Sequence, residues 1–313
     1  MRIGGLLRPR SDSAPAALAF VTVALVLLAV IFREAWLHGY VLGQADFLFD
    51  YLPWQSTRPA GWRVRNPLMG DPPMAFYPFL FHARSEVLRG HFPLWSSAMG
   101  GGQPFFAAMQ TAVLSPFTLF DYILPFPASF SLDVAARLFV GGLGMYLFLR
   151  SLTSGLAAAL FGGVAYLLNP FSIVWLEHPL SAVAAWLPWS LLAVEWCATR
   201  SDGRSVAWMA IITALMIISG HPETAFKVLL LAGAYALYRG WGEGTIVRTT
   251  GLVLSAMLLG VLLTSIQLLP FLEYARESRV MALRETATGP LFTSPAVSFV
   301  TVHPGFFRHA ATT

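Results

Sequence analysis

Three aspartates, Asp46, Asp50 and Asp71, are the first residues of this sequence with the chemistry of a reactive site. Asp46 and Asp50 are four residues apart, so a helical segment would place both side chains on one face. Such a pair can bind a divalent cation or deprotonate a hydroxyl group. A solvated helix face or a cap explains either residue alone equally well. Asp71 stands between Gly70 and Pro72, where a turn-forming role is the alternative.

The only lysine, Lys227, is the matching candidate for holding a negatively charged group. It lies about one turn inside an apolar stretch, and ionisable groups in a membrane span are costly enough to be functional candidates. Two simpler interpretations together have about the same weight as phosphate binding. Glu223 is four residues earlier, so the two can form a helical ion pair worth a few tenths of a kcal/mol. The lysine can also extend its charge to the membrane boundary.

His221, Glu223 and Gln103 are further candidates for substrate binding. His221 lies between Gly220 and Pro222 at the end of an apolar stretch, where a capping role is more usual than metal binding. The neighbouring Glu223 keeps a metal or proton-transfer role open. Gln103 follows a run of three glycines whose backbone amides can approach a phosphate. A flexible connection to the next segment is the simpler interpretation of that run.

Arg276 and Arg279 follow the last apolar stretch, beside Glu273 and Glu277. They are candidates for binding an anionic lipid head group. A helix at the membrane surface, with its charges partly neutralised by its own glutamates, explains them almost as well. No spacing of histidines and acids is specific enough to assign a metal site.

The composition places these residues in a membrane protein. Of 313 residues, 56% are hydrophobic and 12% are charged, and the mean hydropathy is +0.64. A soluble domain usually has about twice that share of charge. The net charge of +4 comes from scattered arginines, which argues against nucleic-acid binding. The single cysteine, Cys197, excludes an internal disulfide and a cysteine-based metal site.

Seven apolar stretches have about the 20-residue length of a helical span. They are Ala14–Phe32, Leu132–Leu149, Gly155–Leu176, Leu180–Cys197, Ser205–Gly220, Thr224–Tyr238 and Gly251–Leu272. The first is too long for a typical signal peptide and has Arg33 and Glu34 where a cleavage site would have small residues, so we interpret it as a retained anchor. The sequence therefore predicts an all-α polytopic membrane protein of about seven spans.

The distribution of arginines predicts the orientation. An eighth apolar stretch, Phe105–Pro125, contains Gln110, Pro116, Asp121 and Pro125. Prolines and an acid are unfavourable in a straight span, so we expect this stretch to be interfacial or re-entrant. The arginines after the spans then share the side of the N-terminus, as the positive-inside rule requires: Arg150, Arg200, Arg204, Arg239 and Arg248. The N-terminus is accordingly predicted to be cytoplasmic.

This topology gives one membrane domain over residues 1–313. The loop over residues 33–104 is extracytoplasmic and rich in aromatic residues and proline, so we expect it to fold against the membrane surface. Segment 105–125 follows on the same side, residues 132–272 supply the other six spans, and residues 273–313 form an extracytoplasmic tail. The aspartates and the turn at His221 are thus predicted to share one side of the membrane.

Five stretches in this order resemble the bacterial YfhO-like membrane proteins, which belong with the GT-C class of glycosyltransferases. They are ADFLFDYLPW, NPLMGDPPMAFYPF, GHFPLWSSAMGGGQPFFAAMQ, SGHPETAF and SIQLLPFLEYARESRV, and they extend from about Asp46 to Arg279. Members of that family are commonly longer, so the chain is similar to a short member or a fragment.

The resemblance implies a transferase in the bacterial inner membrane that takes a sugar from a polyprenyl-phosphate donor at the extracytoplasmic face. For such an activity, Asp46, Asp50 and Asp71 are the candidate base or metal ligands and Lys227 is the candidate phosphate contact. We expect at least one of the aspartates to share a cavity with Lys227 or Arg276. A divalent cation is an open question, and membrane lipid is the expected surrounding partner. The alternatives are a transporter or flippase for a lipid-linked saccharide, and an inactive or accessory membrane subunit.

Overall fold

The computed structural model describes residues 14–40, 42–43, 45–64, 69–126, 128–152 and 155–278, and almost all regular structure in these ranges is helical. The one strand pair joins β1 (Trp95–Ser96) to β2 (Gln103–Pro104) in antiparallel register. The helices are α1 (Ala14–Ile31), α2 (Arg33–His38), η2 (Ala45–Asp50), η3 (Trp54–Thr57), η5 (Pro72–Phe76), α3 (Tyr77–Leu88), η6 (Met109–Thr111), α4 (Leu119–Ile123), α5 (Ala128–Leu152), α6 (Leu156–Leu167), α7 (Pro170–Val174), α8 (Pro179–Ala184), α9 (Leu187–Thr199), α10 (Gly203–Ile218), α11 (Pro222–Gly242), α12 (Ile246–Leu263) and α13 (Ser265–Glu277).

Five helical stretches among the described residues are long and apolar enough to cross a membrane. They are Ala14–Ile31, Ala128–Leu152, Leu156–Val174, Pro179–Thr199 and Ile246–Leu263, and the apolar helix Gly203–Ile218 is shorter. The chain therefore has the character of an all-α, multi-pass membrane protein, as its composition predicts. The count of seven spans stays a prediction.

The last predicted span, Gly251–Leu272, is divided between two helices. α12 ends at Leu263, and α13 begins at Ser265 and has Pro270 inside it. At the break, the Thr264 hydroxyl donates to the Val261 carbonyl at 2.8 Å. The buried Gln267 then donates to the Phe106 carbonyl at 2.7 Å, which ties α13 to the loop before α4. A polar residue inside the predicted span is thus hydrogen-bonded to the segment at the end of the bundle.

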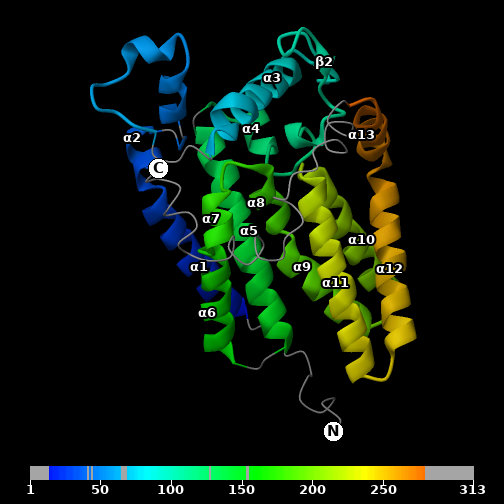
Figure 1. Ribbon diagram of the computed structural model, residues 1–313. Helices are drawn as coiled ribbons and strands as arrows, with labels where there is room; N and C mark the ends of the chain where they lie inside the picture. The colour runs from blue at the N-terminus through cyan, green and yellow to red at the C-terminus, as the bar shows by residue number, and fades with distance from the viewer. Residues whose placement is uncertain are drawn as a thin grey trace, which may run out of the picture.

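The long helices run side by side, and the segment between α1 and α5 covers one end of them (Figure 1). α5 lies between two groups, with α1 and α6 packed on one side and α9 on the other, while α10, α11 and α12 pack around α9. Figure 1 shows α3, α4 and β2 at the covered end, together with α13, and the α11–α12 connection at the opposite end. We call the covered end the cap end.

Small residues let neighbouring helices approach closely, as is common in membrane bundles. A Cβ atom added to Gly142 of α5 would lie 3.1 Å from the carbonyl oxygen of Gly163 on α6. A Cβ added to Gly260 of α12 would lie 2.5 Å from the Cβ of Thr213 and 2.6 Å from the carbonyl oxygen of Ala210 on α10. These two contacts hold α6 against α5 and α12 against α10, which fixes the frame that carries the cap end.

The segment predicted to be interfacial or re-entrant, residues 105–125, forms only the short helices η6 and α4. Phe105, Phe106 and Val113 are buried with Ala83 of α3 in one apolar cluster. The Thr118 hydroxyl oxygen lies 2.7 Å from the Ser115 carbonyl and 2.8 Å from the Ala112 carbonyl, and it can donate its proton to either. The segment therefore folds as a compact loop beneath α3, and its position relative to the membrane stays a prediction.

Candidate functional site

A pocket of about 320 Å³ opens at the cap end, between the loop that precedes α4 and the start of α11. Its wall combines apolar and polar side chains from four segments that are distant in the sequence. The lining residues are Phe79, Gln103, Ala108, Met109, Gln110, His221, Pro222, Glu223, Phe271 and Tyr274. We call it the outer pocket. Its volume lies within the range of small-molecule sites, and its mixed lining is typical of them.

His221 enters the outer pocket from the N-cap of α11. Its Nδ1 accepts a hydrogen bond from the Thr224 backbone N–H at 3.2 Å and lies 2.8 Å from the Thr224 hydroxyl. Burial lowers the pKa of His221, so the ring is neutral near pH 7. Because Nδ1 is the acceptor, the ring proton is on Nε2. His221 is therefore a neutral hydrogen-bond donor at this pocket.

Gly220 allows this turn to lie against the loop. Its φ of +101° belongs to a region that side chains other than glycine rarely adopt. A Cβ at this position would lie 2.9 Å from the Cβ of Ala112 and 3.1 Å from the carbonyl oxygen of Met109. The start of α11 and the η6 segment can thus form one wall only with glycine here.

A second, smaller cavity of about 40 Å³ lies beside the outer pocket and shares Phe79 and Gln110 with it. We call it the inner cavity. Its polar lining includes Tyr77, Gln110, Thr111, Ser115, Thr118, Asp133, Arg137, Glu177 and Ser219. A space of this size accommodates one or a few water molecules when polar partners surround it.

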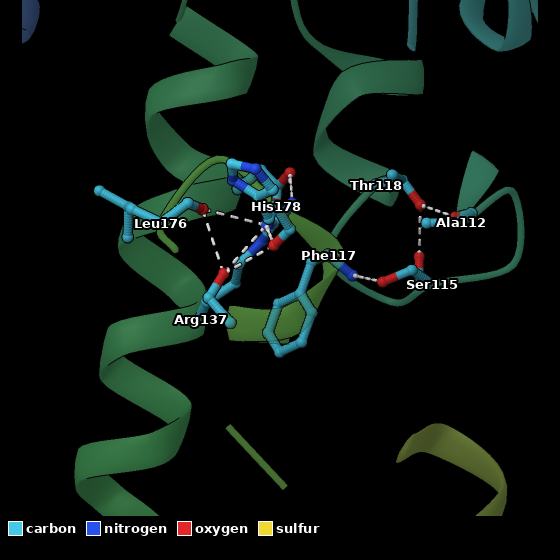
Figure 2. Close-up of polar contacts among 9 residues, drawn as sticks. Ala112, Ser115, Phe117, Thr118, Arg137, Leu176 and His178 are labelled. Atoms are coloured by element: carbon cyan, nitrogen blue, oxygen red, sulfur yellow. Dashed lines mark hydrogen bonds and ion pairs between the residues drawn. The ribbon is translucent and has the colours of Figure 1, made fainter. Parts of the chain in front are cut away.

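Arg137 of α5 fixes the turn between α7 and α8 on one side of the inner cavity. Its Nε and Nη2 donate to the two carboxylate oxygens of Asp133 at 2.7 and 2.5 Å. Its Nη1 donates to the carbonyls of Leu176 at 3.1 Å and His178 at 2.9 Å, and to the Ser181 hydroxyl at 3.2 Å. Figure 2 shows the guanidinium inserted under this turn. One buried side chain therefore holds the backbone on both sides of residue 177.

Glu177 is held between the two carbonyls that Arg137 binds, and its side chain lines the inner cavity. The Tyr77 hydroxyl donates a short hydrogen bond to its Oε2. The Tyr77 ring packs edge-on against Phe130, with centroids 5.5 Å apart. Glu177 thus has a fixed backbone, a fixed hydrogen-bond donor and access to a polar cavity.

His178 is almost completely buried beside this turn. Its ring packs edge-on against Phe76 and Trp175, with centroids 5.0 and 4.9 Å away. Among the described residues, neither ring nitrogen has a hydrogen-bond partner. Burial lowers the pKa of His178 to about 4, although the charge of Asp71 acts in the opposite direction. His178 is accordingly neutral at pH 7, and Asp71 is close enough to influence it.

Asp121 is a fully buried acid in α4, near the same polar region. Arg84 donates to its backbone carbonyl and, at 2.5 Å, to that of Leu124. Burial raises the pKa of the Asp121 carboxyl to about 7, and the negative charge of Asp133 adds to this effect. The folded protein therefore retains a proton here that the unfolded chain loses near pH 4.

Stability should depend on pH through Asp121. Its contribution is complete below about pH 4 and is lost as the pH rises through about 7, because the raised pKa makes the folded state the better proton binder. The full difference is on the order of 4 kcal/mol at about 1.4 kcal/mol per pKa unit. We expect Asp121→Asn to flatten the fall in unfolding free energy between pH 4 and 7, measured by denaturant titration in detergent. An unchanged slope would contradict this assignment.

Gln103, His221 and Glu223, three of the residues predicted to bind substrate, line the outer pocket together. Of the predicted site residues that the structure describes, Asp46, Asp50, Asp71, Lys227 and Arg276 line neither cavity. Asp50 is exposed and pairs with Arg58 at 3.1 Å. Asp46 is half-buried in η2, Asp71 is exposed before η5, Arg276 is exposed on α13, and Arg279 lies outside the described residues.

Lys227 forms the simple ion pair that its spacing from Glu223 allows. The Nζ–Oε1 distance is 2.6 Å, and both side chains are about two-thirds exposed. From the sequence we expected a loop aspartate to share a cavity with Lys227 or Arg276, but among the described residues neither the outer pocket nor the inner cavity brings them together. Lys227 is instead paired with Glu223 at the surface. Asp46 and Asp50 lie in the short helix η2, and Asp71 lies at the start of η5. The catalytic roles of Asp46, Asp50 and Asp71 stay predictions.

The residues that organise the inner cavity were not singled out from the sequence. Asp133 and Arg137 are an opposite-charge pair four residues apart inside the predicted span Leu132–Leu149. Ionisable groups in a span are costly, so these two residues are functional candidates for the same reason as Lys227. Tyr77 had no comparable signal, because its contact with Glu177 joins residues 100 positions apart.

No group of three or more histidine, cysteine or acidic side chains within the described ranges could hold a metal ion. The question of a divalent cation therefore stays open. The fold and site define a multi-pass helical membrane protein with a polar pocket at one end of its bundle. Comparisons of the chain with family models, curated proteins and solved structures find no match.

Proposed function

We propose that this protein is a membrane glycosyltransferase of GT-C type that takes a sugar from a polyprenyl-phosphate donor at the extracytoplasmic face. The observation that carries the proposal is the outer pocket, where Gln103, His221 and Glu223 meet although more than 100 residues separate the first from the others. Gln103 and His221 belong to stretches that resemble the YfhO-like proteins. The resemblance and the pocket therefore favour the same class of protein.

The lining of the outer pocket suits a substrate with both a lipid and a polar part. Phe79, Met109 and Phe271 supply apolar surface. Gln103 and the neutral ring of His221 supply hydrogen-bond donors for phosphate or sugar oxygens. Such donors stabilise the negative charge that a departing phosphate develops.

Glu223 gives this pocket its negative charge, and its ion pair ties Lys227 to the pocket rim. In the proposed complex, the donor phosphate competes with Glu223 for Lys227. An exchange between two exposed partners is inexpensive, because a surface ion pair contributes only about 0–1 kcal/mol. Lys227 thereby keeps the phosphate role proposed from the sequence, as a group recruited on binding.

A transporter or flippase for a lipid-linked saccharide is the second candidate. The buried Asp133–Arg137 pair in the spanning helix α5 favours it, because charges inside a span often mark a transport path. The two candidates differ in whether a glycosidic bond is cleaved. Transport leaves the sugar on its carrier, whereas transfer releases the polyprenyl phosphate.

The location of the donor tests the proposed function. A polyprenyl-phosphate sugar carrying a photoreactive group on the sugar should crosslink to peptides that contain Gln103–Gln110 or His221–Glu223. His221→Asn keeps a cap acceptor for α11 but removes the imidazole, and we expect about tenfold weaker crosslinking, the loss of about one hydrogen bond. Glu34→Gln is the matched control, because Glu34 is exposed on α2 with Arg33 and His38 as partners.

Crosslinking confined to the opposite end of the bundle would overturn the placement of the donor. Equal crosslinking in wild-type protein and His221→Asn would remove His221 from the pocket's function. The photoreactive donor is used at a concentration near its half-saturation value, so that a tenfold loss of affinity is visible.

A further inference from the structure

We propose that Glu177 accepts the proton of the acceptor hydroxyl during sugar transfer, and that Arg137 is the residue that positions it. The inference rests on the proposed glycosyltransferase function and adds the proton acceptor to it. Three features of the inner cavity carry it: the wall that it shares with the outer pocket, the way the turn around Glu177 is built, and the hydrogen bond that orients the Glu177 side chain.

The inner cavity adjoins the place where the donor is proposed to bind. Phe79 and Gln110 belong to both linings, and Ser219 of the inner cavity is two residues before His221 of the outer pocket. The inner cavity, at about 40 Å³, is too small for a sugar and suits a hydroxyl group or water. An acceptor hydroxyl at the boundary between the two spaces would face Glu177 on one side and the donor on the other.

The position of Glu177 is built from buried interactions. Arg137 binds the carbonyls of Leu176 and His178, on both sides of Glu177, at 3.1 and 2.9 Å. The Ser181 hydroxyl oxygen lies 3.1 and 3.0 Å from the same two carbonyl oxygens and can donate its one proton to either. Two buried side chains therefore hold the backbone on both sides of Glu177.

The Glu177 side chain is oriented by the hydroxyl group of Tyr77. Arg137 is balanced by Asp133, with both of its other guanidinium nitrogens on that carboxylate. Tyr77 holds Glu177 Oε2 through a neutral hydroxyl. His178, the next residue, is neutral at pH 7 because burial lowers its pKa to about 4. A carboxylate that is held on a fixed turn beside a polar cavity can act as a general base.

The proposed step conserves atoms and electrons. The acceptor hydroxyl oxygen forms a bond to the anomeric carbon of the sugar, while the bond from that carbon to the phosphate oxygen breaks. The electron pair of the broken bond leaves with the polyprenyl phosphate. The hydroxyl proton passes to the Glu177 carboxylate, directly or across one water of the inner cavity, and is later released to solvent.

Glu177→Gln tests the proposal because it preserves the size and hydrogen bonding of the side chain but removes the base. We expect the rate of transfer to fall by about 10²-fold or more, with crosslinking to the photoreactive donor unchanged. The acid limb of the pH profile of kcat/KM should also disappear. In Glu177→Ala, added formate should restore part of the rate, which a purely structural role of Glu177 would not permit.

Arg137→Lys tests positioning, because lysine keeps the charge but cannot bind Asp133 and two carbonyls at once. We expect a lower kcat with an unchanged acid limb, since Glu177 is still present. Glu34→Gln again serves as the control with wild-type kinetics.

The outcomes separate this inference from the proposed function. Wild-type protein that binds no donor and transfers no sugar would overturn both. Wild-type transfer with an equally active Glu177→Gln would overturn the role of Glu177 alone. A Glu177→Gln variant that loses donor crosslinking together with transfer would assign Glu177 to binding or folding, and would also overturn the proposal.

Discussion

Replacing Arg137 with methionine is expected to lower the free energy of unfolding by about 3–5 kcal/mol, the usual cost of removing one partner from a buried ion pair. The Asp133 side chain is only 2% exposed and would retain an uncompensated charge. The carbonyls of Leu176 and His178 would lose their guanidinium donor at the same time. Unfolding of the purified protein in mixed micelles, followed by tryptophan fluorescence, measures the change.

A double substitution, Asp133→Leu with Arg137→Met, is the control for this prediction. It removes both charges, so it should recover much of the lost stability. Transfer activity should nevertheless stay low, since nothing would position Glu177. A double variant as unstable as Arg137→Met alone would show that the carbonyl contacts, rather than the ion pair, provide the stability.

Replacing Glu195 with alanine should have a similarly large effect at the opposite end of the bundle. Glu195 accepts hydrogen bonds from Arg239 at 2.5 and 2.9 Å and a short one from the Tyr235 hydroxyl. It joins α9 to α11, and the Arg239 side chain is only 10% exposed. We expect a loss of about 3–5 kcal/mol in the free energy of unfolding, because the guanidinium keeps only Glu243 as an acidic partner.

Glu243→Gln is the matched comparison for Glu195→Ala. Glu243 binds the same arginine at 3.1 Å, but its side chain is 33% exposed. Its replacement should cost no more than about 1 kcal/mol, as for a surface pair. Donor crosslinking in both variants should match that of wild-type protein at temperatures where they are folded. Equal losses of stability in the two variants would contradict the importance of burial.

The membrane class and most of the helices follow from the sequence, because apolar length is a local property of the chain. The stretches Ala14–Phe32 and Ser205–Gly220 correspond closely to α1 and α10. The break at Thr264 does not follow from it. Just after the break, Gln267 donates a hydrogen bond to the Phe106 carbonyl, and no local pattern contains a contact between residues 161 positions apart.

The candidate site divides in the same way. His221 and Glu223 are predictable, since a glycine, a proline and two polar residues at the end of an apolar stretch mark a helix start. Gln103 is predictable only as a loop residue, and its place beside them depends on the folding of the cap end. Lys227 was attractive as a rare charge, but its neighbour Glu223 satisfies it locally.

For Asp133 and Arg137, the sequence predicts the ion pair but not the second contact that Arg137 makes. Their spacing predicts an ion pair, and their place in a span predicts burial. Neither predicts that Arg137 also binds the turn after α7, because that turn is 39 to 44 residues further along the chain. The function of the pair therefore becomes visible only in three dimensions.

The most direct test of the account is transfer itself, measured with purified protein in proteoliposomes that contain a radiolabelled polyprenyl-phosphate sugar. The account predicts release of free polyprenyl phosphate together with a labelled acceptor, and about 10²-fold less of both with Glu177→Gln. Movement of the intact donor across the bilayer without bond cleavage would contradict it and favour a flippase. So would the absence of any release by wild-type protein that binds the donor.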